Sequence, residues 1–408
     1  MPPCWPGKPP VITIAHVSDT HLGRREFPLH TEPDPHFVGR ISPVREVDLR
    51  RAFARCIDIA IAENVDLFLH TGDLFDGPNP TFLTIGFAMD QFARLGAAGI
   101  PSLLISGNHS CPLVRDRGHV LALLRHVPLL TVVTEESALV RYMELDLQVL
   151  AIPHWAVQED AIQEPSELLR VNLVAAHAAV DGDPRYLSFW EPSERTLMLG
   201  STVASYDYVA LGHYHSFECV DGVDGASIYY AGAPERVVCK REFDDGERGF
   251  ALVRIDAAAP AGTRTEVVLV PSGSRSVVDL GVVDGANAGV EVVLGRIRFL
   301  AEGQDLAGCI VKLVVVNLSE DTHFALTDKR LAEALPGVIV WAETRTLPAE
   351  TAVDGVAADR SEGAIRAELR KIVDGLSVST GEKEWLLRHA QLYLNEEVRD
   401  AAALITPS

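Results

Sequence analysis

Short apolar runs alternate with amphipathic stretches from residue 11 to about residue 270. This alternation is typical of the strands and helices of a layered α/β domain. Two amphipathic stretches, residues 48–63 and 81–98, carry apolar residues at helical spacing, and Pro80 fits the start of the second helix. The apolar runs predict six strands, at residues 11–17, 65–70, 101–106, 147–152, 171–177 and 206–211.

The later part of the chain predicts further elements and two boundaries. Three more β-rich segments follow, at residues 227–230, 249–255 and 265–271, and a Pro/Gly/Ser stretch at 271–276 has no apolar periodicity. Beyond it, we expect strands at 292–299 and 310–316, a helix at 326–335, and a helical stretch at 361–405. These elements predict a core domain at 1–272, a smaller α/β capping domain at 273–355 and a C-terminal helical segment at 356–408.

The composition describes a globular protein. The chain has 408 residues, of which 47% are apolar, enough for a sizeable core. The first ten residues do not resemble a signal peptide, and no apolar run approaches the roughly 20 residues that a membrane helix needs, so we expect a soluble cytoplasmic protein. The six cysteines are scattered without a CxxC pair, which favours reduced, mostly buried thiols over a zinc-thiolate site.

The formal net charge is −21, which is unusual for a protein that binds nucleic acid. Affinity for a phosphate backbone comes largely from lysine and arginine, which release counterions. A nucleic-acid enzyme of this composition would need locally clustered basic residues or a partner that supplies part of the binding.

Polar motifs with metal-ligand side chains follow several of the predicted strands. Singly, each motif is explained as well by a turn, a helix cap or a hydrogen-bonded core histidine. Together, seven candidate ligands, four of them histidines, each following a strand at one edge of an α/β sheet, predict a dinuclear metal site. The motifs are Asp19-Thr20-His21, Gly72-Asp73, Gly107-Asn108-His109, His177 and Gly212-His213-Tyr214-His215.

The spacing within the motifs gives expectations about local geometry. If the backbone stays extended, Asp19 and His21 point the same way, and so do His213 and His215. Gly72 lets the chain turn sharply, so that the next residue, an aspartate, reaches inward. The mixture of oxygen and imidazole ligands, with no thiolate, suits manganese or iron, and zinc is also compatible with it.

The ordered motifs D-x-H, GD, GNH, H and GHxH resemble the signature of the calcineurin-like metallophosphoesterase superfamily. This resemblance implies a layered α/β core of two central sheets flanked by helices. It also implies one ion held by Asp19, His21, Asp73 and His215, and a second held by Asp73, Asn108, His177 and His213, with Asp73 bridging. Catalytic roles fall on His109, Asp73 and Asn108, and His109 is the expected general acid.

Longer strings resemble the SbcD-type DNA repair nucleases. They include residues 16–23 (HVSDTHLG), 72–76 (GDLFD), 206–213 (YDYVALGH) and 229–236 (YYAGAPER). The resemblance implies a manganese-dependent exo- and endonuclease that cuts DNA ends or hairpins in double-strand-break repair. It further implies a homodimer that works with an SbcC-like coiled-coil ATPase. Because this chain has no G-x-x-x-x-G-K-[ST] motif, that other subunit would have to bind the nucleotide.

Two features depart from the nuclease pattern or extend it. Ser110 follows Gly-Asn-His where the family usually has an aspartate, which puts the orientation of His109 in question. A long loop at residues 24–47 carries four arginines, which are candidates for contacts with DNA phosphates or solvated side chains. A second candidate group is Arg236, Lys240 and Arg241, and the loop arginines are Arg24, Arg25, Arg40 and Arg45.

Two other functions stay open at this point. The acidic balance is also compatible with a nucleotide or cyclic-nucleotide phosphodiesterase of the same superfamily. The serine at position 110 and the unusual loop are compatible with a weakly catalytic DNA-binding scaffold subunit, although all seven ligand positions are occupied by ligand residues.

Overall fold

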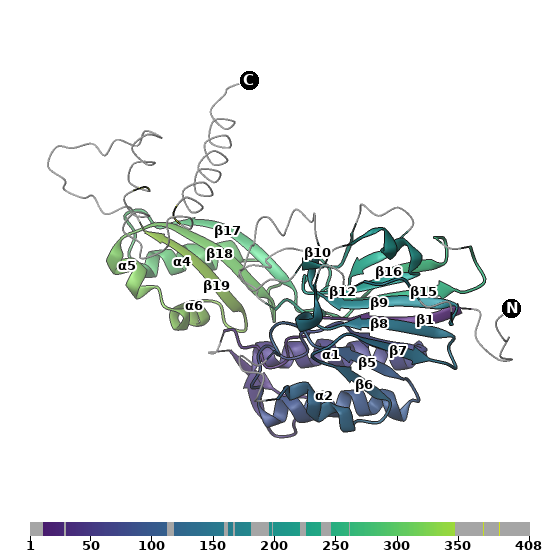
Figure 1. Ribbon diagram of the computed structural model, residues 1–408. Coiled ribbons are helices and arrows are strands. Elements are labelled where there is room, and N and C mark those ends of the chain that lie inside the picture. Colours follow the sequence, from purple (N-terminus) through teal and green to yellow (C-terminus); the bar gives the residue numbers. More distant parts are fainter. Residues whose placement is uncertain are drawn as a thin grey trace. The chain divides into compact units, whose positions relative to one another are not determined.

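The computed structural model describes residues 11–27, 30–111, 118–158, 162–165, 168–180, 196–197, 199–220, 226–237, 246–260 and 262–346, with Arg370 and Lys383. The chain divides into two compact units, Met1–Leu347 and Pro348–Ser408. All elements named below belong to the first unit (Figure 1).

The first sheet has six strands in the order β16-β15-β1-β4-β5-β6. Strands β1, β4, β5 and β6 run parallel, and β15 is antiparallel to both β1 and β16. Neighbouring parallel strands therefore end at the same edge. The bounds are Val11–Val17 for β1, Leu67–His70 for β4, Ser102–Ile105 for β5, Leu130–Val133 for β6, Gly249–Asp256 for β15 and Thr265–Pro271 for β16.

Helices α1 (Val44–Ala62) and α2 (Phe82–Ala97) cover one face of this sheet (Figure 1). Their apolar sides pack on Phe68 and neighbouring strand residues, and Phe53 and Phe92 form part of this core. The Thr81 side chain caps α2 by accepting a 3.2 Å hydrogen bond from the Thr84 backbone N–H. Because α1 begins at Val44, part of the segment predicted as a loop is helical.

The second sheet has the order β13-β14-β12-β9-β8-β7 and packs against the other face of the first sheet. The layer between them is apolar, with Ile14 and Leu69 from one sheet against Val149 and Leu173 from the other. The bounds are Ala138–Tyr142 for β7, Leu147–Ile152 for β8, Val171–His177 for β9, Tyr208–Gly212 for β12, Glu218–Cys219 for β13 and Ile228–Tyr230 for β14.

A separate three-stranded parallel sheet lies later in the chain, in the order β17-β18-β19. It has its own apolar core, shared with three helices. The strands are β17 (Val277–Asp284), β18 (Ile310–Leu318) and β19 (Ile339–Thr346), and the helices are α4 (Val290–Ala301), α5 (Glu320–Ala325) and α6 (Asp328–Ala334).

The strand predicted at 292–299 is wrong, because these residues belong to helix α4. The β-branched residues and the alternation around Arg296 and Arg298 favour a strand. However, β17 and β18 are parallel neighbours, and a parallel connection needs a crossover, usually a helix. The buried residues Val293, Leu294 and Ile297 follow the helical period.

The linker before β17 is held by charged groups rather than being free. The Arg275 guanidinium donates to both carboxylate oxygens of Asp48 on α1, at 2.6 and 2.7 Å, and to Glu32 at 3.2 Å. Its backbone N–H donates to Glu235, whose carboxylate also accepts from the buried Arg45. The linker is therefore anchored to the core by a network of ion pairs.

The other predicted strands and helices up to residue 335 are confirmed with small shifts of their ends. The helical prediction at 361–405 lies outside the described residues apart from Arg370 and Lys383, which are helical, and the predicted domain limits at 272 and 355 stay predictions. The expectation of mostly buried thiols is wrong for the described cysteines, because only Cys56 of the four is buried. None of the helices in the described residues combines the length and the apolar character of a membrane span.

The sequence did not reveal several elements. In the sheets these are β6, β7, β13, β17 and β19, and among the helices α5. The others are short and sit mainly in connections: β2 (Thr31–Pro33), β3 (Ile41–Pro43), β10 (Ala179–Val180), β11 (Thr196–Leu197) and the 3-10 helices Val120–His126, His154–Ala156 and Ser201–Ser205.

We expect Ile297→Ala to lower the free energy of unfolding by about 2–5 kcal/mol, since it removes a fully buried side chain. Phe299→Ala should change it by less than about 0.5 kcal/mol, because Phe299 is 74% exposed on the helix. Urea denaturation of the two variants measures both values. A strand would place both side chains on one face, so equal losses would contradict the helix.

Candidate metal centre

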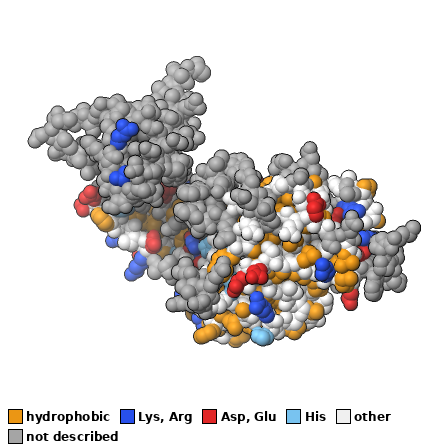
Figure 2. Space-filling model, in the orientation of Figure 1, with side chains coloured by type: hydrophobic (Ala, Val, Ile, Leu, Met, Phe, Trp, Pro, Cys, Tyr) orange, Lys and Arg blue, Asp and Glu red, His pale blue; other side chains and the backbone are white. Residues whose placement is uncertain are grey.

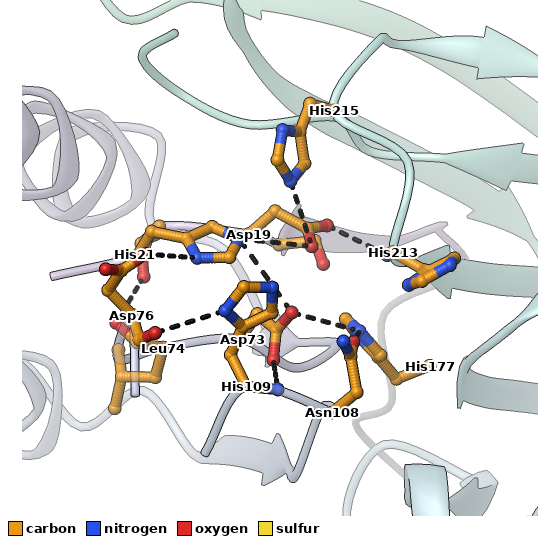
Figure 3. Close-up of polar contacts among 12 residues, drawn as sticks. Asp19, His21, Asp73, Leu74, Asp76, Asn108, His109, His177, His213 and His215 are labelled. Atoms are coloured by element: carbon orange, nitrogen blue, oxygen red, sulfur yellow. Dashed lines mark hydrogen bonds and ion pairs between the residues drawn. The ribbon is translucent and has the colours of Figure 1, made fainter. Parts of the chain in front are cut away.

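The candidate ligands lie where strands of both large sheets end (Figure 3). Asp19 and Asp73 follow the parallel strands β1 and β4, and Asn108 follows β5. His177 is the last residue of β9, and His213 follows β12, its parallel neighbour in the second sheet. The seven predicted metal-ligand positions are thus brought together: Asp19, His21, Asp73, Asn108, His177, His213 and His215.

The backbone at these residues is left-handed rather than extended, so the expected extended geometry is wrong. The φ angles are +50° at Asp19, +42° at His21, +50° at Asp73 and +114° at His213. Non-glycine residues rarely adopt positive φ, and each such residue costs on the order of 1–3 kcal/mol. The side chains are therefore directed by strained turns after the strands.

Gly72 is required by a close approach as well as by its φ of +103°. A Cβ at this position would lie 2.3 Å from Nδ1 of His177. The turn is also tied to the first motif, because the Gly72 carbonyl accepts from the Asp19 N–H at 3.1 Å and the Asp73 carbonyl accepts from the His21 N–H at 3.0 Å. The first two motifs therefore form one rigid unit.

Asp19, His21 and His215 offer ligand atoms that all lie within 4.8 Å of one another. Nε2 of His21 and Nε2 of His215 are each 3.9 Å from Oδ1 of Asp19, and Nε2 of His21 is 3.8 Å from Oδ2 of Asp73. Among the residues that the structure describes, Oδ1 of Asp19 and Nε2 of His21 are buried and have no hydrogen-bond partner. Since such atoms are costly to bury, a cation between them fits this side of the site.

A second group consists of Asp19, Asp73 and His177. His177 donates from Nδ1 to the Thr71 carbonyl at 2.8 Å, which fixes the proton on Nδ1 and leaves Nε2 as a ligand atom. That Nε2 lies 3.3 Å from Oδ2 of Asp73 and 2.9 Å from Oδ1 of Asn108. Nitrogen and oxygen atoms converge here as they do in the first group.

Charge and burial oppose each other in this second group. Burial lowers the pKa of His177, but the Asp73 carboxylate outweighs it and raises this pKa to about 9, so a cation that binds Nε2 must displace a proton from it. Burial likewise disfavours ionisation of Asp73, yet the adjacent imidazoles of His177, His21 and His109 hold its pKa well below the ordinary value. Asp73 is therefore a carboxylate and not a carboxylic acid.

His213 contacts the first group through its backbone. Its N–H donates to Oδ2 of Asp19 at 3.0 Å, and its ring centroid lies 5.4 Å from that of His177. The hydrogen bond orients the Asp19 carboxylate, so that Oδ1 faces His21 and His215.

His109 is held in place without help from Ser110. The backbone N–H of His109 donates to Oδ1 of Asp73 at 2.9 Å, and its Nδ1 donates to the Asp76 carbonyl at 3.1 Å. Ser110 is buried, and no described residue forms a hydrogen bond with its hydroxyl. Asp73 and Asp76 therefore orient His109, although a serine follows it where the family usually has an aspartate.

Asp76 is a part of the site that sequence reasoning missed. Its carboxylate lies 3.3 Å from Nδ1 of His21 and 3.4 Å from Nη1 of Arg24. Its position three residues after Asp73 was the available signal, because a turn after a strand brings such a carboxylate back towards the same histidines. It joins a candidate ligand, His21, to the candidate proton donor, His109.

The structure corrects two of the predicted phosphate contacts. Arg45 is 1% exposed and paired with Asp48 and Glu235, and Arg236 is 4% exposed and donates to backbone carbonyls. Neither guanidinium can reach a phosphate on the surface. Arg40 is exposed, whereas Lys240 and Arg241 lie outside the described residues.

The other loop arginines already have carboxylate partners. Arg24 pairs with Asp76, and Arg25 pairs with Glu46. On the face drawn in Figure 2, the described basic side chains are scattered singly among acidic, apolar and other groups. The described residues of this face therefore offer no concentrated basic surface.

Comparisons with known proteins agree with this geometry. The profile of the calcineurin-like phosphoesterase family matches residues 12–217, half of the chain. The chain is 30% identical over 247 residues to the DNA double-strand break repair protein Mre11 of Saccharolobus solfataricus, covering 59% of this chain and 58% of that protein. It is 26% identical over 299 residues to the Mre11 protein of Sulfolobus acidocaldarius, covering 70% and 71%.

A third relative resembles a shorter part of the chain more strongly. The Mre11 protein of Methanosarcina mazei is 40% identical over 98 residues, which are 24% of this chain and 14% of that protein. The chain thus spans less than three fifths of the length of the first relative. The family match covers all five motifs in full, and the donors gathered there fit divalent cations. By its sequence and by its site, this chain belongs to the calcineurin-like phosphoesterase family.

Proposed function

We propose that this chain is a metal-dependent DNA exo- and endonuclease, which hydrolyses phosphodiester bonds at DNA ends or hairpins in double-strand-break repair. The observation that carries the proposal is the convergence of two buried carboxylates and several imidazoles at the ends of both sheets. The names of the relatives support DNA as the substrate.

We assign the ligands as two overlapping sets. One ion would be held by Asp19, His21, Asp73 and His215, and the other by Asp73, Asn108, His177 and His213. The unpartnered Oδ1 of Asp19 and Nε2 of His21 support the first set, and the contact of His177 with Asn108 and Asp73 supports the second. Manganese fits this mixture of oxygen and imidazole donors, as do iron and zinc.

When bound, two divalent ions supply polarisation of the phosphate and activation of the attacking water. The chain's own residues supply orientation and a proton. Asp73 holds the His109 backbone at 2.9 Å, and Asn108 stands next to His177, so Asp73 and Asn108 set the position at which a phosphate would meet His109.

His109 is assigned as the general acid that protonates the departing sugar oxygen. Its Nδ1 proton is committed to the Asp76 carbonyl, so Nε2 is the atom that would carry and release the transferred proton. The side chain is exposed, unlike His21 and His177, which suits a group that must reach a substrate.

Partner subunits would supply much of the binding affinity for DNA. The net charge is −21, and three of the four loop arginines, Arg24, Arg25 and Arg45, already pair with Asp76, Glu46 and Asp48. We therefore propose a homodimer that acts in the cytoplasm with an SbcC-like coiled-coil ATPase, which would bind the nucleotide and add basic surface.

The negative net charge and the paired arginines also support a second candidate, a nucleotide or cyclic-nucleotide phosphodiesterase. A small substrate needs fewer phosphate contacts than a duplex, so the burial of Arg45 and Arg236 would not weaken its binding. A weakly catalytic scaffold subunit is disfavoured, because His109 is oriented despite the serine at position 110.

In the presence of Mn²⁺, the purified chain should cleave end-labelled linear duplex and hairpin DNA. Asp73→Ala should lose both cleavage and Mn²⁺ binding, because it removes the shared carboxylate. His109→Ser should keep two bound ions and lose about 10²–10⁴-fold in cleavage rate, the contribution typical of a general acid. Gel electrophoresis of the products and calorimetric Mn²⁺ titration measure the two effects.

A generic phosphodiester ester serves as the control substrate, with and without an SbcC-like ATPase. Turnover of the ester while DNA stays intact, even with the ATPase added, would exclude the nuclease and support the nucleotide phosphodiesterase. Binding of two ions without turnover of any substrate would support the scaffold.

Gly107→Ala tests the assigned position of Asp73. A Cβ at Gly107 would lie 2.2 Å from Oδ1 of Asp73, so the carboxylate must move. We expect Mn²⁺ affinity to fall by about 10–100-fold, as when a supporting group of a metal site is lost.

Gly86→Ala is the matched control, since Gly86 lies in α2 and an added Cβ would have no described atom within 4 Å apart from its chain neighbours and the backbone of its own helix. It should leave Mn²⁺ affinity unchanged and raise stability by about 0.5–1 kcal/mol through helix propensity. Unchanged affinity in Gly107→Ala would remove Asp73 from the ligand set.

A further inference from the structure

Three polar side chains interrupt the apolar layer between the two large sheets. Side chains alternate along a strand, so Ile12 and Ile14 of β1, which face this layer, are followed on the same face by His16. By the same rule, Leu67 and Leu69 precede Thr71. Tyr208 enters the layer from β12 of the opposite sheet.

These three residues are joined by short hydrogen bonds. Nδ1 of His16 is 2.8 Å from the Tyr208 hydroxyl, and Nε2 of His16 is 2.9 Å from Oγ1 of Thr71. All three residues are fully buried. Burial, with a smaller contribution from nearby His70, lowers the pKa of His16 to about 3, so the ring is neutral and can donate from one nitrogen while it accepts at the other.

The hydrogen-bonded chain crosses from one sheet to the other. His16 and Thr71 belong to the first sheet or its edge, whereas Tyr208 belongs to the second. The surrounding buried layer is mostly aliphatic, and its packing does not fix the direction of any one contact. A hydrogen bond between the sheets is directional, so it fixes one sheet against the other at the end of the strands where the ligands lie.

The three hydrogen-bonded residues also reach the candidate ligands at both ends of their network. The Thr71 carbonyl accepts from Nδ1 of His177 at 2.8 Å, and Thr71 is followed directly by Gly72 and Asp73. His16 lies three residues before Asp19, and Tyr208 lies on the strand that ends before His213. Each of the three hydrogen-bonded residues therefore lies just upstream of a ligand motif or supports one.

We propose that His16, Thr71 and Tyr208 are positioning residues, which lock the two sheets in register so that the ligands from both sheets meet at one metal centre. Asp19, Asp73 and Asn108 follow strands of the first sheet. In the second sheet, His177 ends β9, and His213 and His215 follow β12. A shift of one sheet against the other would separate these two groups of donors. The inference rests on the proposed metal site but not on the nature of the substrate.

Tyr208→Phe and Thr71→Val in the full chain test the lock, since each removes one hydroxyl with little change of shape. We expect Mn²⁺ affinity at the weaker site to fall by about 10–100-fold in both. Thr71→Ser, which keeps the hydroxyl, should bind Mn²⁺ like the wild type. Calorimetric titration of the metal-free protein measures affinity, and electron paramagnetic resonance reports whether paired Mn²⁺ ions remain magnetically coupled.

Tyr206→Phe is the matched control. The Tyr206 hydroxyl donates to the Gln163 carbonyl at 2.7 Å, next to the start of β12 and away from the ligands. It should lose a comparable amount of thermal stability and keep Mn²⁺ affinity and coupling. A fall in affinity equal to that of Tyr208→Phe would assign the effect to general destabilisation and overturn the inference.

Two further outcomes separate the inference from the function it rests on. If the wild type binds two Mn²⁺ ions and Tyr208→Phe and Thr71→Val bind them equally well, the lock is refuted and the metal site stands. If the wild type binds no Mn²⁺, the metal site fails and the inference fails with it. Loss of coupling in Thr71→Val alongside wild-type coupling in Thr71→Ser supports the lock.

Discussion

Two buried carboxylates at the junction of the sheets place the strongest constraint on this structure. Asp19 and Asp73 offer oxygens within 4.8 Å of one another, at residues that are at most 2% exposed. Like charges so close in a poorly solvated place oppose folding unless positive charge lies between or beside them. The surrounding imidazoles and backbone N–H groups offset part of this cost, and divalent cations would offset the rest.

Local strain and close packing follow from that constraint. The left-handed residues after β1, β4 and β12 turn the side chains into a space that an extended chain would bypass. Gly72 and Gly107 allow backbone segments to approach the ligands more closely than a Cβ would permit. Burial of the apolar layers on both faces of the first sheet offsets the conformational strain of these turns, and these layers are large enough to hold strained loops in place.

Sequence patterns predicted the strands that carry the ligands, because long apolar runs and the motifs after them are local signals. The left-handed conformation of Asp19 and His21 was not predictable, since it depends on hydrogen bonds to residues about 50 positions away. Helix α4 was missed because its β-branched residues favour a strand and only the parallel neighbours of the sheet require a crossover. Burial of Arg45 was equally hidden, as its partner Glu235 is distant in sequence.

Arg275 changes what the linker before β17 can do. A Pro/Gly/Ser linker of this kind ordinarily behaves as a flexible tether, and the segment after it then explores a wide range of orientations. Here the guanidinium is held by Asp48 and Glu32 only two residues before β17 begins. The three-stranded sheet therefore starts from a fixed pivot, and any large swing must first break charge pairs, so it should become easier as ionic strength rises.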